Sequence, residues 1–139
     1  METITIFTEG GSRGNPGPAA VGVHIVDPKG LVLKELAETI GNATNNFAEY
    51  HAVMRGLQVA KELFGEKTMN MHFEVKLDSE LVKKQLNNEY QIKEPGLVPY
   101  FIEVHNMRVS SFPNLILTHI SRELNVEADR LVNKALNAG

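Results

Sequence analysis

The chain has 139 residues, of which 42% are hydrophobic and 22% are charged, a composition typical of one globular domain spanning residues 1–139. The absence of cysteine excludes a disulfide scaffold, a thiolate zinc site and a cysteine nucleophile. The net charge of −3, from 14 Lys and Arg against 17 Asp and Glu, has the wrong sign for binding nucleic acid through overall charge alone.

The sequence shows no sign of a membrane or secretory segment. Its N-terminus lacks the basic region of a secretory signal, and no apolar run approaches the roughly 20 residues that a membrane helix needs. No internal repeat, low-complexity tract or linker is visible. We therefore expect a soluble, cytoplasmic protein without a membrane partner.

The first part of the chain predicts three consecutive strands. Alternating apolar and polar side chains predict a strand from Thr3 to Glu9, and the segment GGSRGNPGP predicts a turn after it. Two more strands are predicted over residues 20–26 and 31–40, joined by the turn sequence DPKG. Because the links are short, we expect these three strands to be antiparallel neighbours.

The rest of the chain alternates helices and strands. After GNATNN, apolar residues recur every three or four positions and predict a long helix that ends near Gly65. The elements predicted after it are a strand over 72–77, helices over 81–86 and 97–109, a strand over 115–120 and a helix over 126–136. The order βββαβααβα predicts an α/β fold with a five-stranded mixed sheet and helices on both faces.

Some familiar motifs are matched poorly. Residues 10–14 fit the G-x-S-x-G pattern of serine hydrolases, but that motif must lead from a strand into a helix, and here it leads into a strand. Neither a dinucleotide-binding nor a Walker spacing is present. No histidine pair has metal-ligand spacing, so we interpret all five as structural or surface residues. They are His24, His51, His72, His105 and His119.

Four carboxylates stand at the ends of predicted elements: Glu9, Glu49, Asp78 and Asp129. Glu49 has an alternative role in a helix-capping box with Asn46. Asp78 could instead cap the helix that follows it, and Asp129 could suit the positive end of its own helix. Glu9 has no such alternative, because its strand face is predicted to point toward a covering helix, where an unpaired carboxylate is costly.

These carboxylates come together if the first and fourth strands are adjacent and parallel. Glu9 and Asp78 would then lie at the same edge of the sheet, and the flanking helices could bring Glu49 and Asp129 there too. Four clustered carboxylates repel one another unless divalent cations neutralise them. A ligand set made only of oxygen favours hard cations such as Mg²⁺ or Mn²⁺.

Four blocks of the sequence closely resemble, in order and spacing, the signature blocks of type 1 ribonuclease H: FTEGGSRGNPGP, TNNFAEYHAV, VKLDSELV and HISRELNVEADRLVNKA. The resemblance covers essentially the whole chain and implies the ribonuclease H-like fold. In that family four acidic residues hold two metal ions, and these fall here on Glu9, Glu49, Asp78 and Asp129. The first is Glu where the family pattern has Asp.

The resemblance implies an endoribonuclease that cleaves the RNA strand of RNA–DNA hybrids and leaves 5′-phosphate and 3′-hydroxyl ends. It implies two Mg²⁺ ions, with Mn²⁺ as a substitute, no organic cofactor, and a monomer. The substrate-binding residues that it implies are Asn15, Thr44, Asn45, Asn46 and Ser79. Asn and Thr at such positions also serve as turn and cap residues.

Three features depart from the family pattern. Glu9 is one methylene longer than Asp, so its carboxylate must either fold back or displace a metal, and we expect slow cleavage. The segment QLNNEYQIKEPG does not resemble the basic, aromatic protrusion of some members, which predicts weaker and more salt-dependent binding. The loop SRELNVEA lacks the His that many members place there, so Arg122 and Glu123 are its candidate replacements.

Two other functions stay open at this point. The first is a catalytically weak or inactive module that binds RNA–DNA hybrids through the same Asn-rich loops. The second is a metal-dependent nuclease with another substrate, such as DNA or structured RNA.

Overall fold

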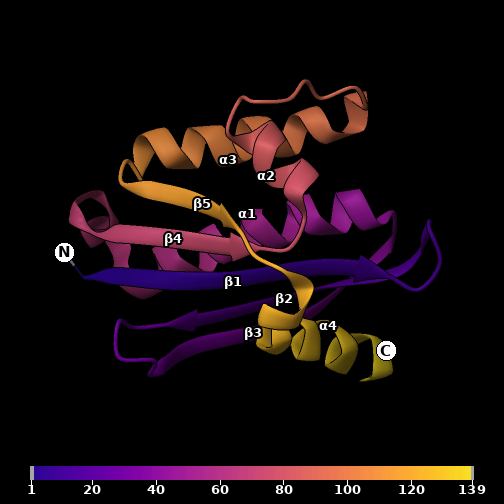
Figure 1. Cartoon of the computed structure of the whole chain (residues 1–139), viewed down its shortest axis with the longest axis horizontal. Coiled ribbons are helices and arrows are strands. Elements are labelled where there is room, and N and C mark those ends of the chain that lie inside the picture. Colours follow the sequence, from indigo (N-terminus) through magenta and orange to yellow (C-terminus); the bar gives the residue numbers. More distant parts are fainter. Residues whose placement is uncertain (1, 139) are drawn as a thin grey trace.

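The computed structural model describes residues 2–138 and has the predicted order of strands and α-helices (Figure 1). The strands are β1 (Thr3–Ser12), β2 (Gly17–Val26), β3 (Val32–Ala43), β4 (His72–Leu77) and β5 (Leu115–His119). The α-helices are α1 (Asn45–Phe64), α2 (Glu80–Leu86), α3 (Val98–Ser110) and α4 (Val126–Ala138). Three short 3₁₀ helices were not predicted: η1 (Gly65–Asn70), η2 (Pro95–Leu97) and η3 (Arg122–Leu124).

The five strands form one mixed sheet in the order β3-β2-β1-β4-β5. β1 and β2 are antiparallel, as are β2 and β3, whereas β4 runs parallel to both β1 and β5. This arrangement confirms the predicted α/β fold and the parallel pairing of the first and fourth strands. It also places β1 at the centre of the sheet.

Helices cover both faces of the sheet (Figure 1). Two neighbouring glycines of β1 face opposite helices: a Cβ on Gly10 would meet the backbone of Ala48 in α1, and one on Gly11 would face Val132 in α4. The strand β2 is buried on both faces, which explains why its sequence PAAVGVHIV shows little alternation. Within residues 2–138, no helix is long and apolar enough to span a bilayer.

The hydrophobic core lies mainly between the sheet and helices α1, α2 and α3. Its largest fully buried side chains include Tyr50, Phe73 and Phe112. A smaller cluster lies under α4 and contains Ala20, Val132 and Ala135. Together the two clusters fix the positions of α1 and α4 on opposite sides of β1.

The predicted strand ends around the glycine-rich segment after Glu9 were wrong. β1 continues to Ser12 and β2 begins at Gly17, so the turn is limited to residues 13–16. Gly10 pairs with Val21 in this extension, where the absence of a side chain lets α1 approach closely. Glycine therefore marks a close helix contact here, and not the end of the strand. Similarly, β3 continues beyond residue 40 to Ala43, and β5 ends one residue earlier than predicted.

Candidate active site

The parallel register of β1 and β4 sets two carboxylates side by side. Thr8 lies opposite Leu77, so the residues that follow them, Glu9 and Asp78, meet at the same edge of the sheet. Glu9 is only 6% exposed. The expected burial of Glu9 next to a second carboxylate is therefore what the structure shows.

Glu49 reaches this edge from α1. The N-cap of α1 is Thr44, whose Oγ1 accepts a hydrogen bond from the Phe47 N–H at 3.2 Å. Glu49 consequently lies beyond the first turn, and the capping box with Asn46 is wrong. One carboxylate oxygen of Glu49 instead accepts a hydrogen bond from the Gly10 N–H at 3.2 Å. The other, Oε2, is buried and has no hydrogen-bond partner within residues 2–138.

Asp78 is not the cap of α2, because Ser79 takes that role and accepts a hydrogen bond from the Val82 N–H at 3.2 Å. The Asp78 carboxylate instead accepts a hydrogen bond from Asn125 Nδ2 at 3.3 Å. Asp129 lies in the first turn of α4, as predicted, so a favourable interaction with the helix dipole remains compatible with the structure. Its carboxylate accepts a hydrogen bond from Asn133 Nδ2 at 3.3 Å.

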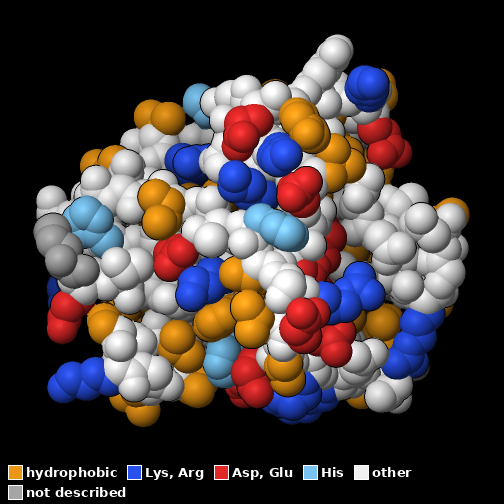
Figure 2. All heavy atoms as spheres, viewed as in Figure 1, with side chains coloured by type: hydrophobic (Ala, Val, Ile, Leu, Met, Phe, Trp, Pro, Cys, Tyr) orange, Lys and Arg blue, Asp and Glu red, His pale blue; other side chains and the backbone are white. Residues whose placement is uncertain are grey.

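One cavity of about 560 Å³ is lined by all four carboxylates. They come from four different segments: the end of β1, the second turn of α1, the residue after β4 and the first turn of α4. The face of the molecule in Figure 2 shows acidic and basic side chains intermixed, without a continuous basic patch. The cavity is therefore acidic, and the face in Figure 2 has no continuous basic patch that would attract nucleic acid strongly.

Burial and mutual repulsion favour protons on the cluster. Burial raises the pKa of Glu9 to about 10, helped by hydrogen bonds with Asp78 and Asp129 and by the charges of those two groups. Burial and the charge of Asp78 raise the pKa of Glu49 to about 8, although the Gly10 N–H and Arg122 oppose the change. In the absence of cations, the cavity therefore retains protons at neutral pH.

The predicted substrate residues divide into two groups. Asn45, Asn46 and Ser79 line the cavity. Asn15 and Thr44 lie outside its lining and hold the neighbouring loops, because Asn15 Oδ1 accepts a hydrogen bond from the Asn45 N–H at 2.9 Å and Thr44 caps α1. Asn15 and Thr44 therefore both make the turn and cap contacts that were the alternative to substrate binding.

The loop before α4 contributes one of its two predicted residues. Arg122 lines the cavity, whereas Glu123 is exposed and is not part of the lining. Sequence reasoning missed Asn125, which is fully buried beside Asp78. It also missed Arg13 and Asn133, which line the cavity. The only sequence signal for Asn125 is an Asn directly before a predicted helix, and its burial and its distant partners are not visible in the sequence.

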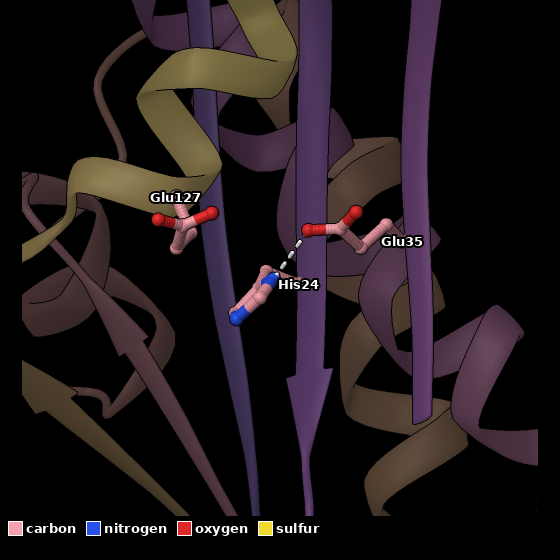
Figure 3. A group of neighbouring side chains, drawn as sticks. All are labelled: His24, Glu35 and Glu127. Atoms are coloured by element: carbon pink, nitrogen blue, oxygen red, sulfur yellow. Dashed lines mark hydrogen bonds and ion pairs between the residues drawn. The ribbon is translucent and has the colours of Figure 1, made fainter. Parts of the chain in front are cut away.

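A second group of possible metal ligands lies outside this cavity and comprises His24, Glu35 and Glu127 (Figure 3). His24 Nδ1 lies 2.7 Å from Glu35 Oε2. Arg130 already contacts both carboxylates, at 2.6 Å to Glu35 and 3.0 Å to Glu127. The group therefore forms an ionic contact between α4 and the sheet, which fits the interpretation of His24 as structural.

Several known proteins are similar to this chain in fold and in sequence. A family model described as "Reverse transcriptase-like" matches residues 7–135. The structure of LC11-RNase H1, isolated from compost by a metagenomic approach, has a TM-score of 0.93 and 46% identity to this chain, and the match covers 99% of this chain and 98% of that one. The chain belongs to the type 1 ribonuclease H family.

One further relative and a second structure of LC11-RNase H1 indicate how far the similarity of this ribonuclease H family member extends. Ribonuclease HI of Halobacterium salinarum is 39% identical over 134 residues, which are 96% of this chain but 64% of that protein. The chain thus spans slightly less than two thirds of this curated relative. A structure of LC11-RNase H1 in complex with an RNA/DNA hybrid has a TM-score of 0.93 and 45% identity, with 97% of both chains covered.

Proposed function

We propose that this ribonuclease H family member is a metal-dependent endoribonuclease that cleaves the RNA strand of RNA–DNA hybrids and leaves 5′-phosphate and 3′-hydroxyl ends. The convergence of four carboxylates from four segments in one cavity carries the proposal. The hybrid complex of the similar LC11-RNase H1 supports the choice of substrate.

The cavity fits two divalent cations, Mg²⁺ in the first place and Mn²⁺ as a substitute. Its candidate ligands, Glu9, Glu49, Asp78 and Asp129, offer only oxygen atoms, which suit hard cations. Glu49 Oε2 is buried and has no protein partner in the described chain, as a metal ligand would be before binding. When bound, such ions lower the pKa of a water molecule and stabilise charge on the departing oxygen.

The protein's own contribution is to hold these carboxylates in place. The Gly10 N–H fixes one oxygen of Glu49, and Asn133 fixes one oxygen of Asp129. The charge of Arg122 opposes the increase in the pKa of Glu49, and we propose that Arg122 also faces the incoming phosphate. Preformed geometry of this kind decreases the reorganisation that the reaction requires.

Recognition of the hybrid is proposed for the polar residues at the rim of the cavity. Asn45, Asn46 and Ser79 present amide and hydroxyl groups suited to sugar 2′-hydroxyls and backbone atoms, which distinguish RNA from DNA. Asn15 supports Asn45 through its hydrogen bond, and Thr44 is the proposed contact to the DNA strand. We propose that Arg122 and the exposed Glu123 together take the place of the loop His that many family members have.

One observation favours a second function, a module that binds hybrids but cleaves them slowly or not at all. Glu9 is buried against Asp78 and Asp129, and its pKa is raised to about 10. A metal must displace the proton from this longer side chain before it can bind there. Binding of the hybrid, which depends on the Asn-rich loops, would survive a misplaced metal.

A cleavage assay on labelled duplexes tests these functions together. RNA–DNA hybrid, DNA duplex and RNA duplex are each incubated with Mg²⁺ or Mn²⁺, beside an Asp78→Asn control. Shortened RNA with 5′-phosphate ends from the hybrid alone is the expected result. Retarded but intact hybrid on a native gel would support the binding module, and cleavage of another duplex would reassign the substrate. The monomeric state and cytoplasmic location stay predictions.

A further inference from the structure

A buried side chain that the proposed chemistry does not use contacts the acidic cluster. Asn125, at the residue just before α4, has no exposed surface. Its Nδ2 donates hydrogen bonds to the Thr8 carbonyl oxygen at 3.0 Å and to Asp78 Oδ2 at 3.3 Å. The backbone carbonyl oxygen of Asn125 accepts a hydrogen bond from the Asp129 N–H at 3.1 Å, at the start of α4.

These three contacts connect the segments that carry three of the four carboxylates. Thr8 immediately precedes Glu9 in β1, Asp78 follows β4, and Asp129 belongs to α4. Asn125 lies 117 residues from Thr8 and 47 residues from Asp78 along the chain. A single residue thus connects β1, the end of β4 and the start of α4: its side chain binds the first two, and its backbone begins the third.

The amide group of Asn suits this position better than the side chain of Asp or Ala would. Both partners of Nδ2 are acceptors, a carbonyl and a carboxylate, so they require a group with two N–H donors. An Asp here would place its oxygens against these acceptors, and an Ala would leave the buried Thr8 carbonyl without its donor. The orientation of the Asn125 amide is therefore determined by its partners.

We propose that Asn125 is a positioning residue that holds Asp78 and the first turn of α4 in the geometry that binds metal. The proposal rests on the proposed function for the role of the carboxylates. Residues that hydrogen-bond to metal ligands orient them, and their loss usually decreases metal affinity or activity by about 10- to 100-fold. Asn125 is not itself a candidate metal ligand, and it donates such a hydrogen bond to Asp78, which is one.

The test compares the full chain with Asn125→Ala and Asn125→Asp. Calorimetry with Mn²⁺ alone measures metal affinity, and three-bond couplings measure the side-chain rotamers of Asp78 in the metal-free protein. We expect Mn²⁺ affinity to fall about 10- to 100-fold in Asn125→Ala. We expect Asp78 to change from one rotamer to several in both variants, and kcat on the hybrid to fall while KM stays within about twofold, because substrate contacts lie elsewhere.

Ala135→Gly is the matched control, because Ala135 is buried on the same helix but does not line the cavity. Glycine weakens α4, so this variant should have a lower melting temperature but an unchanged Mn²⁺ affinity and Asp78 rotamer. An equal loss of affinity in Ala135→Gly would overturn the proposal, as would Asn125 variants with the Asp78 rotamer and affinity of the original chain.

Failure of the proposed function is distinguishable from failure of this inference. A chain that binds Mn²⁺ and hybrid but leaves the RNA intact overturns the nuclease function, while the affinity difference still supports or refutes Asn125. A chain that binds no Mn²⁺ overturns the metal site, and the metal-free Asp78 rotamers then decide whether Asn125 positions that carboxylate.

Discussion

Glu9 and Asp78 occupy matching positions on two parallel strands, one residue beyond the Thr8–Leu77 pair. The two carboxylates share this edge with Asp129. Burial raises the pKa of Glu9 to about 10, and hydrogen bonds with Asp78 and Asp129 and repulsion from them add to the increase. The space for a cation at this edge is therefore set by the length of the side chain at position 9.

Shortening that side chain by one methylene should accelerate cleavage. A displacement of about 1 Å at a reacting centre can decrease a rate about a hundredfold, so Glu9→Asp should cleave a labelled hybrid up to about a hundredfold faster in Mg²⁺. The increase should be smaller with Mn²⁺, whose coordination is less demanding. Initial rates under single-turnover conditions measure the difference, and equal rates in Mg²⁺ would show that the longer side chain is accommodated.

Divalent cations should stabilise the folded protein. Because they bind the folded cluster and relieve its repulsion, millimolar Mg²⁺ should raise the melting temperature. Asp78→Asn removes one charge from the cluster and should reduce this increase. Differential scanning fluorimetry with Mg²⁺ and with chelator compares the two proteins. Identical melting with and without metal would indicate that the carboxylates serve structural roles instead.

The metal-free protein should lose stability as pH rises. The pKa values of Glu9 and Glu49 are raised in the folded state to about 10 and about 8, from 4.5. Between pH 5 and pH 8 the folded protein therefore binds more protons than the unfolded chain, and its free energy of unfolding decreases with pH. This contribution is complete below the unfolded pKa and is lost as pH passes first the Glu49 and then the Glu9 value.

Urea titrations in chelator at several pH values measure this slope. Glu9→Gln cannot titrate at position 9 and should have a shallower slope than the original chain. Saturating Mg²⁺ should also flatten the profile, because the cations replace the protons. A stability that increases from pH 5 to pH 8 in the presence of chelator would contradict the raised pKa values.

The contact between β1 and α1 should tolerate no side chain at Gly10. A Cβ there would lie 2.0 Å from the Ala48 carbonyl carbon, so Gly10→Ala should decrease the free energy of unfolding by about 3 kcal/mol. Gly11→Ala is the matched comparison, because its Cβ would lie 3.7 Å from a Val132 methyl and should change stability by less than about 1 kcal/mol. Chemical denaturation of both variants distinguishes this contact from general intolerance of the strand.

The order of elements could be predicted from the sequence because each has a clear period. The alternation around Ile4 and Ile6 and the three-to-four spacing in α1 reflect which faces are buried. The strand ends were harder, since Gly10 looks like a turn residue and is in fact a place where two backbones approach. Local composition does not distinguish these two uses of glycine.

The acidic residues of the candidate site could be predicted from the sequence, but the residues that hold them in place could not. The N-x-x-E pattern at Asn46 suggested a capping box, yet the N-cap is Thr44. β3 ends at Ala43 and α1 begins at Asn45, so Thr44 is the residue between them. Asn125 and Glu49 have hydrogen-bond partners 117 and 39 residues away, at Thr8 and Gly10. Only the folded chain brings such pairs together.

Because Asp129 lies on α4, which follows β5 in the chain, the cluster cannot be complete before α4 has been synthesised. A nascent chain that has emerged as far as β5 already contains Glu9, Glu49 and Asp78, but α4 and its carboxylate are still missing. Asn125, which joins these parts, arrives with the same segment. Asp129 and the residue that joins its helix to β1 and Asp78 are therefore synthesised in the same segment, and the four carboxylates come together only after α4 has packed on the sheet.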